Sequence, residues 1–253
     1  MSIDDKIVQL RKDLLNELAF EDAGYPGACL STLDILFSLY YYVMDIRPKH
    51  YSWDGRDRFI MCKEHCRAAL YTILADRKYF GEEGLEALHQ LIKEYGDKNL
   101  PGVESDAGSS LGRLDDVLRF AAEAKESGAE YRVYALMGDD DYMNPDFTEK
   151  LSAASEDGLD SLTVIMDHNM DSSADTAGIC ASFEEMGFDC RSTAGNSDSI
   201  TNALEASYEE GKPRFICCET FFGEGLPSIQ FALNWDDAAV KGADCARLAE
   251  ELG

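Results

Sequence analysis

The sequence has few basic residues and no long apolar run. Its 23 lysines and arginines stand against 49 aspartates and glutamates, which gives a formal net charge of −26 at pH 7. This excess of negative charge would repel nucleic-acid phosphate and anionic membranes, so it argues against a nucleic-acid-binding protein. No stretch approaches the ~20 apolar residues that a membrane-spanning helix needs. The first residues, Met1 to Asp5, lack the features of a signal peptide. We therefore expect a cytoplasmic protein.

The sequence also lacks a regular cysteine framework, internal repeats and linker-like segments. Its eight cysteines are irregularly spaced, and Cys217 and Cys218 are neighbours inside an apolar run. This pattern favours reduced thiols over disulfides. The composition, 45% hydrophobic and 28% charged over 253 residues, is that of a globular protein. We expect residues 1–253 to form a single domain.

Apolar residues recur in two patterns along the chain. Spacings of three and four residues, as at Leu10, Leu14 and Leu18, predict helices, whereas short apolar runs predict buried strands. The predicted helices cover residues 3–21, 31–44, 62–77, 82–95, 114–127, 179–187 and 198–210, with a last one from about Asp236, and the predicted strands cover residues 133–137, 162–166, 188–192 and 215–218. Ser31 is predicted to cap the second helix. Strands that alternate with helices indicate an α/β fold, with a parallel sheet flanked by helices on both faces.

Acids and amides follow the two most apolar runs. The run at 133–137 ends in Gly138-Asp139-Asp140-Asp141, and the run at 162–166 ends in Asp167-His168-Asn169. Open α/β sheets bind ligands at the carboxyl ends of their strands. Asp139 and Asn169 are therefore predicted to converge on one hard cation.

Several glycine-rich and charged segments occur in one unbroken order before the first of these runs. They are Gly24-Tyr25-Pro26-Gly27, Arg56-Asp57-Arg58-Phe59-Ile60, Cys62-Lys63-Glu64-His65, Gly102-Val103-Glu104 and Ser109-Ser110-Leu111-Gly112. In this order they resemble the G-H-P-G, D-R-F-V-L, S-K-G-H, G-V-E and G-S-L-G motifs of the diphosphate-binding half of transketolase.

The resemblance continues through the rest of the chain. Gly138-Asp139-Asp140 stands where that family has G-D-G, and residues 159–169 stand at its L-D-N-L-x-x-x-x-D-x-N segment. Lys212-Pro213 and residues 219–225 are similar to its K-P and T-x-x-G-x-G segments. The match covers residues from about 10 to 225, and several collinear motifs are far more specific than any one of them.

The resemblance implies thiamin diphosphate bound through a divalent cation. Asp139 and Asn169 would supply side-chain oxygens and Asp171 a backbone carbonyl oxygen, a set of ligands that suits magnesium or calcium. His65 and Glu149 would be catalytic residues. The residues implied to contact the cofactor are His65, Ser110, Leu111, Gly112, Gly138, Asp139, Asp140 and Asn169. Ser109 to Gly112 are expected to form part of a loop that faces it.

The resemblance also implies a partner. In this family a second domain holds the pyrimidine end of the cofactor, and nothing after residue 225 is long enough to be that domain. The chain is therefore expected to act with a separate pyrimidine-binding subunit, with two copies of each forming a heterotetramer.

The chain departs from the family pattern at functional positions. Tyr25 replaces the histidine of G-H-P-G, Glu64 replaces the glycine of S-K-G-H, and Asp140 replaces the second glycine of G-D-G. A charge at Asp140 about 4 Å from a diphosphate would cost roughly 4 kcal/mol at an effective dielectric constant of 20. The cost falls if Asp140 turns outward, and the site changes if Asp140 joins the metal ligands. The sequence does not choose between them.

These observations favour a transferase subunit of the transketolase type, which moves a ketol or acyl unit from a ketone or 2-oxo acid donor. Besides the histidine replaced by Tyr25, the family has histidines between the positions of His89 and His168 and after His168, where this sequence has none. These missing histidines argue against a pentose-phosphate substrate. Two alternatives stay open. One is a scaffold or regulatory subunit that keeps the fold without the cofactor, and the other is a metal-binding protein of a different kind.

Overall fold

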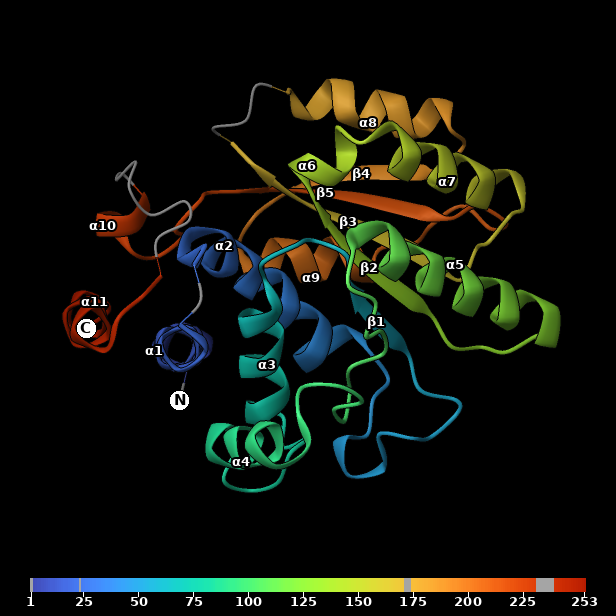
Figure 1. The fold of residues 1–253 in the computed structure, drawn as a ribbon. Helices are drawn as coiled ribbons and strands as arrows, with labels where there is room; N and C mark the ends of the chain where they lie inside the picture. The colour runs from blue at the N-terminus through green and yellow to red at the C-terminus, as the bar shows by residue number, and fades with distance from the viewer. Residues whose placement is uncertain (1, 23, 171–173, 231–238) are drawn as a thin grey trace.

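The computed structural model describes all residues except 1, 23, 171–173 and 231–238 (Figure 1). The strands are β1 (Arg58–Met61), β2 (Val133–Gly138), β3 (Leu162–Asn169), β4 (Asp189–Ala194) and β5 (Arg214–Thr220). The helices are α1 (Ile3–Glu21), α2 (Pro26–Ser38), α3 (Arg67–Asp76), α4 (Leu85–Tyr95), α5 (Ser110–Ser127), α6 (Asp139–Tyr142), α7 (Pro145–Glu156), α8 (Thr176–Glu185), α9 (Ser197–Glu205), α10 (Pro227–Gln230) and α11 (Gly242–Glu251). A π-helical turn (Leu39–Val43) extends α2, and a 3₁₀ turn (Pro48–His50) precedes β1.

The five strands form one parallel sheet in the order β1-β2-β3-β5-β4. Because the strands are parallel, their carboxyl ends lie at one edge, and the register pairs Gly138 of β2 with Asp167 of β3. Asn169 of β3 is in turn paired with Thr220 of β5. The polar residues that follow the apolar runs therefore meet at this edge, as the sequence predicted.

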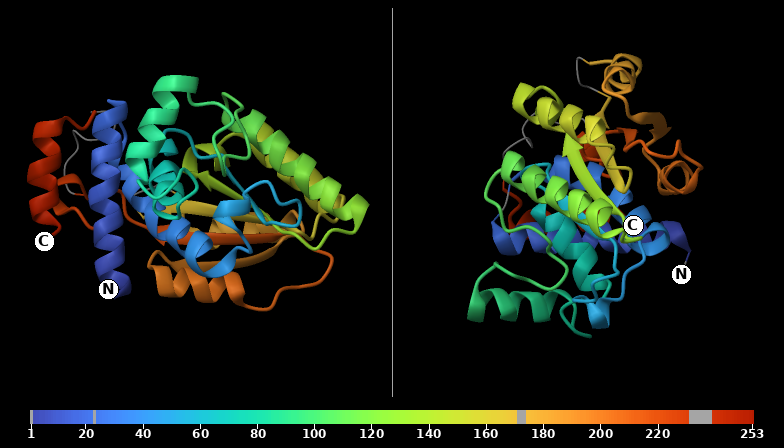
Figure 2. Two further views of the ribbon diagram at one scale, coloured as in Figure 1. Left: turned by 90° about the horizontal axis from the view of Figure 1, so that it is seen from below. Right: turned by 90° about the vertical axis from the view of Figure 1, so that its right-hand side faces the viewer.

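Helices cover both faces of the sheet (Figures 1 and 2). Helices α5, α7 and α8 pack on one face, and α2 and α9 pack on the other, with α1, α3 and α11 beyond them. Strand residues alternate between the two layers. On β2, for example, Ala135 belongs to the core beneath α5, α7 and α8, and Leu136 belongs to the core on the other face. The fold confirms the predicted α/β class.

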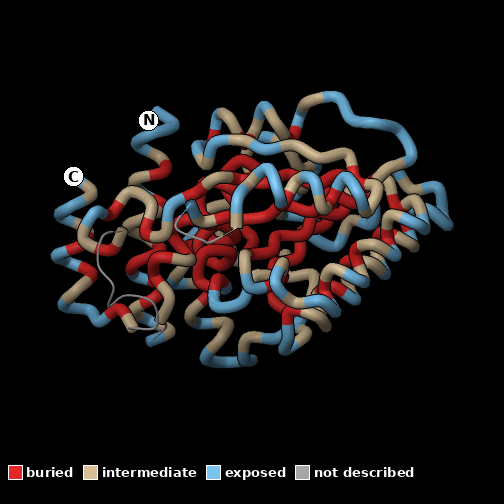
Figure 3. The backbone as a smooth tube through the Cα atoms, turned by 90° about the horizontal axis from the view of Figure 1, so that it is seen from above, coloured by how far each residue is buried: buried red, intermediate tan, exposed pale blue. Residues whose placement is uncertain are grey.

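Burial follows this layering, because the strands and the inner faces of the helices are buried while the outer faces are exposed (Figure 3). No helix among the described residues is long and apolar enough to cross a membrane. That residues 1–253 form a single domain stays a prediction.

The segment after Arg58 differs from the prediction of a helix over 62–77. Residues Arg58–Met61 form β1, an edge strand paired with β2, and α3 begins only at Arg67. The amides of Cys62 and Lys63 both donate to Leu136 O, so this connection stays bound to β2 before α3 begins. Pairing with β2 prevails over the helical spacing of the first residues.

The second helix begins earlier than predicted. It starts at Pro26 with Tyr25 as the N-cap residue, so Ser31 lies inside α2 and does not cap it. The Ser31 hydroxyl donates to Ala28 O and to Asp167. A proline at the first helical position needs no amide partner, which explains the earlier start.

Two other boundaries also move. Ser109 to Gly112 were expected to lie in a loop, but Ser109 caps α5 by accepting a hydrogen bond from Gly112 N, and the helix begins at Ser110. The helix predicted over 198–210 ends at Glu205. The predicted start of the last helix, Asp236, lies outside the described residues, and α11 begins at Gly242.

Candidate functional site

A cleft of about 600 Å³ opens at the carboxyl edge of the sheet. The start of α2, the connection between β1 and α3, the ends of β2 and β3, and the first residue of α5 contribute to its walls. The lining residues are Tyr25, Ala28, Lys63, Glu64, His65, Ser110, Gly138, Asp139, Asp140, Asp141, Asn144, Asp167, Asn169 and Phe222. Most of the residues that the sequence singled out therefore lie around one space.

Asp139 and Asn169 lie side by side in this cleft. The backbone amide of Asn169 donates to Asp139 Oδ2 at 3.1 Å. The side-chain amide nitrogen of Asn169 donates to Thr220 Oγ1 at 2.8 Å and lies 3.4 Å from Asp167 Oδ1. Since that nitrogen is engaged by the protein, the amide oxygen is the atom that Asn169 can offer to a ligand. The two residues line one cleft, as expected, while the convergence of their side-chain oxygens on a metal stays a prediction.

His168 fixes the second oxygen of Asp139. Its Nδ1 lies 2.6 Å from Asp139 Oδ1, and its side chain is buried. Carboxylates that bind metals are commonly held by such a second hydrogen bond, which sets their orientation. No role was predicted for His168. It lies between Asp167 and Asn169 in β3, so its side chain points to the opposite face of the strand.

A paired charge forms the floor of the cleft. The Lys63 ammonium lies 2.6 Å from Asp167 Oδ2, which also accepts hydrogen bonds of 2.8 Å from the Ser31 and Thr32 hydroxyls. Burial alone would raise the pKa of Asp167, but the Lys63 charge and these hydrogen bonds outweigh it and hold the pKa below its ordinary value. This carboxylate is therefore charged and structurally engaged.

The three consecutive aspartates at the end of β2 point in different directions. Asp141 is buried and accepts hydrogen bonds from Gly138 N at 2.9 Å and from the Ser110 hydroxyl. Burial raises its pKa above the ordinary value. Asp140 is exposed at the rim of the cleft. Solvent therefore screens its charge, and its repulsion of a diphosphate in the cleft would be smaller than that of a carboxylate shielded from solvent.

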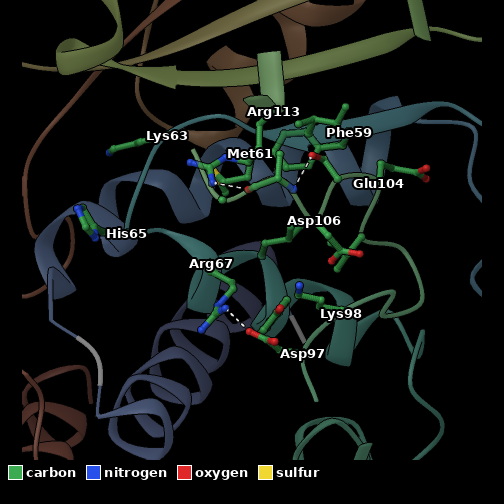
Figure 4. A pocket seen from close by; sticks show the side chains of 17 residues that line it. Phe59, Met61, Lys63, His65, Arg67, Asp97, Lys98, Glu104, Asp106 and Arg113 are labelled. Carbon is green, nitrogen blue, oxygen red and sulfur yellow. Dashed lines mark hydrogen bonds and ion pairs between the residues drawn. The ribbon is translucent and has the colours of Figure 1, made fainter. Parts of the chain in front are cut away.

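His65 lies at the junction of two cavities. It lines the cleft and also a second cavity of about 340 Å³ between β1, α3 and the loop before α5 (Figure 4). The Arg67 side chain in that second cavity forms an ion pair with Asp97 at 2.5 Å. The charge of Arg67 is thus compensated by the chain itself.

Other predicted site residues lie elsewhere. Leu111 packs against the core beneath α5, and Gly112 lies in the first turn of that helix. Glu149 is exposed on α7 and does not line the cleft. Asp171 lies outside the described residues. The proposed roles of these four residues stay predictions.

The donors at the cleft fit a divalent cation that bridges to a diphosphate. Acidic side chains surround the space, so a diphosphate without a cation would be repelled. Among the described residues, no three His, Cys, Asp or Glu side chains gather into a metal site. A cation here would therefore need the oxygens of Asp139 and Asn169 together with oxygens of the ligand, which is the arrangement that hard cations accept.

Comparison with known proteins agrees with this geometry. The family model described as "Transketolase, thiamine diphosphate binding domain" matches residues 3–253. The chain belongs to this family. It is 30% identical over 241 residues to an apulose-4-phosphate transketolase subunit of Actinobacillus succinogenes, covering 90% of this chain and 87% of that protein. The apulose-4-phosphate transketolase subunit of Phocaeicola vulgatus is 28% identical over 237 residues, covering 89% and 84%.

A solved transketolase has the same fold. The crystal structure of transketolase from Campylobacter jejuni aligns with a TM-score of 0.77 and 26% identity, and the alignment covers 99% of this chain and 43% of the solved one. This transketolase-family chain thus spans less than half of the solved transketolase, but most of the two apulose-4-phosphate transketolase subunits.

Sequence reasoning missed the floor of the site in this transketolase-family chain. Lys63 and Asp167 were quoted within motifs, but neither was assigned a role. The available signal was weak: Lys63 follows the apolar residues 59–62, and a buried ammonium needs a nearby carboxylate. Thr220 was missed as well, since a single threonine at the end of a strand carries no pattern.

Proposed function

We propose that this chain is the diphosphate-binding subunit of a split, thiamin-diphosphate-dependent enzyme of the transketolase type. It would transfer a ketol or acyl unit from a ketone or 2-oxo acid donor, together with a separate pyrimidine-binding subunit. The observation that carries the proposal is the meeting of Asp139 and Asn169 in one cleft. Family membership and the relatives described as transketolase subunits support it.

Different residues would bind the metal ion, orient its ligands and contact the substrate. Asp139 and Asn169 would hold magnesium or calcium, and His168 would keep the Asp139 carboxylate in place. Lys63 and Asp167 neutralise each other, so the floor adds little net charge beside the diphosphate. When bound, thiamin diphosphate supplies a carbon nucleophile and an electron sink, which make the transfer possible. His65, at the edge of the cleft, would bind the substrate and hold or pass a proton at its imidazole.

The partner would complete the site. We infer that the cleft would receive the diphosphate end of the cofactor, because Asp139 and Asn169 line it. A pyrimidine-binding subunit would cover the other end of the cofactor and exclude water from it. Two copies of each subunit form the heterotetramer that we propose, and the mass of the purified complex in solution would test it.

Calorimetry with thiamin diphosphate and magnesium tests the binding site. We expect micromolar binding to the chain purified with its partner subunit, and loss of that binding in Asp139→Ala, because the cation loses its charged ligand. Asp146→Ala is a matched control, since Asp146 is exposed at the start of α7 and does not line the cleft.

The same measurement decides a second candidate, a scaffold subunit without cofactor. One observation favours it: both oxygens of Asp139 already accept hydrogen bonds within the chain, so the fold does not need a cation to satisfy them. Absence of heat at millimolar cofactor, with magnesium or calcium, would refute the enzyme and support the scaffold.

A further inference from the structure

Tyr25 and His65 face each other at the mouth of the cleft. Their rings are stacked, with centroids 4.0 Å apart and an interplanar angle of 16°. Tyr25 is the residue before α2, and His65 lies in the connection between β1 and α3. The contact therefore joins two segments that come together only in the folded chain.

Both residues have a left-handed backbone. The φ angle is 62° at Tyr25 and 63° at His65. Residues with a β-carbon rarely adopt this conformation, and it persists where the surrounding structure imposes it, often at functional sites. The left-handed φ indicates that the backbone at both residues is held in place by the fold.

Cys29 anchors the backbone on both sides of the stack. Its amide donates to Tyr25 O at 3.1 Å, and its thiol donates to His65 O at 3.3 Å. Cys29 is fully buried in α2. Cys29 thus fixes the backbone positions of Tyr25 and His65. The stacking then fixes the orientation of the two rings.

Two other histidines contact carboxylates, and one of them, His89, is also stacked on Phe20. His168 contacts the Asp139 carboxylate, and His89 contacts the Glu17 carboxylate, each at 2.6 Å. Among the described side chains, none forms a hydrogen bond with the His65 imidazole, and the ring is exposed. The face of Tyr25 is therefore a contact that can restrict its rotation.

The orientation of His65 matters because of its place. It borders both the cleft and the second cavity, and in Figure 4 it lies at the margin of that cavity, apart from the ion pair of Arg67 and Asp97. A free imidazole there could turn toward either space. A fixed ring presents its nitrogens in one direction only.

We propose that Tyr25 is a positioning residue for His65, whose imidazole it holds in one orientation at the junction of the two cavities. The stacking depends on an aromatic face and not on the phenolic hydroxyl. The value of this orientation for catalysis rests on the proposed function, whereas the orientation itself does not.

Nuclear magnetic resonance of the isotope-labelled full chain tests the orientation without cofactor or partner. A ring above an imidazole shifts the imidazole protons upfield, so we expect the His65 signals several tenths of a ppm upfield of those of His50, which is exposed. Cross-relaxation between the protons of Tyr25 and His65 should also be present. The substitution His65→Gln assigns the signals. Absence of cross-relaxation in the unaltered chain would overturn the proposal and requires no variant to fold.

Two substitutions separate the ring from the hydroxyl. Tyr25→Phe should leave the His65 shifts in place, whereas Tyr25→Leu should move them to the values of His50. Phe20→Leu is the matched control, because Phe20 stacks on His89 at 3.5 Å away from the cleft. It should change the signals of His89 and leave those of His65 unchanged. Unchanged His65 shifts in folded Tyr25→Leu would contradict the proposal.

A chemical readout completes the test. Diethyl pyrocarbonate modifies exposed imidazoles, and mass spectrometry reports the rate at each histidine. Tyr25→Leu should raise the modification rate at His65 several-fold and leave that at His50 unchanged. Tyr25→Phe should keep the rate at His65 equal to that of the unaltered chain. Equal rates at His65 in all three chains would overturn the proposal. The calorimetric test of cofactor binding is separate, so either proposal can fail without the other.

Discussion

Asp167, at the floor of the cleft, and Glu17, between α1 and α4, are both fully buried carboxylates with different surroundings. Lys63 neutralises Asp167, and three hydroxyl groups donate to it, which holds its pKa below the ordinary value despite burial. Glu17 has one partner, His89, and its Oε1 has no partner among the described residues. Burial raises its pKa to about 7.

The two carboxylates are predicted to respond differently to pH. A charged, saturated Asp167 keeps the same state over a wide pH range, so the ends of β3 and β5 keep their geometry around Asn169. Glu17 and the neighbouring Glu21, whose pKa burial also raises to about 7, change state near neutral pH. The charge of Asp167 is thus predicted to be insensitive to pH, while the contact between α1 and α4 responds to it.

Removing the positive charge of Lys63 should have the largest effect on stability. Lys63→Met leaves the Asp167 carboxylate buried without its countercharge, and we expect a loss of about 3–5 kcal/mol in the free energy of unfolding. Chemical denaturation at neutral pH measures it. Lys49→Met is the control, because Lys49 pairs with Glu82 at 3.8 Å with side chains 81% and 76% exposed. A loss no greater than that of the control would remove the contrast between the clusters.

The change in stability that accompanies the titration of Glu17 should be the next largest effect. The unfolded Glu17 loses its proton near its ordinary pKa of 4.5, whereas the folded one keeps it to about 7. Its contribution is therefore complete below pH 4.5 and is lost as the pH rises to about 7, by roughly 2–3 kcal/mol. Glu17→Gln should flatten this part of the curve, as measured by denaturation at several pH values. An unchanged slope in the variant would assign the effect to other groups.

Removing one of the three hydroxyl groups that donate to Asp167 should have the smallest effect on stability. The Thr220 hydroxyl donates to Asp167 and to His168 O, and it accepts a hydrogen bond from the Asn169 side chain. Thr220→Val removes these hydrogen bonds and leaves the lysine in place. We expect a loss of about 1–2 kcal/mol, measured by chemical denaturation. Thr148→Val, on the outer face of α7, is the control and should change stability less. A loss as large as that of Lys63→Met would mean that hydrogen bonds, and not the countercharge, hold Asp167.

The prediction of fold and site from sequence succeeded where a pattern repeats. The apolar runs of β2 and β3 identified two central strands, and their polar ends located the cleft. The edge strand β1 was missed because only four residues form it and its pairing with β2 is not local. The role of Ser31 was missed for a similar reason: its acceptor, Asp167, is distant in sequence, while the capping pattern is local.

The sequence alone determined the class of fold, the family and the meeting of Asp139 with Asn169, because parallel strands bring their carboxyl ends to one edge regardless of detail. The tertiary structure decided which way each side chain points. It turned Asp140 to solvent, paired Lys63 with Asp167 and stacked Tyr25 on His65. These outcomes depend on burial, on countercharges and on contacts between distant segments, and none of these is encoded in the order of neighbouring residues.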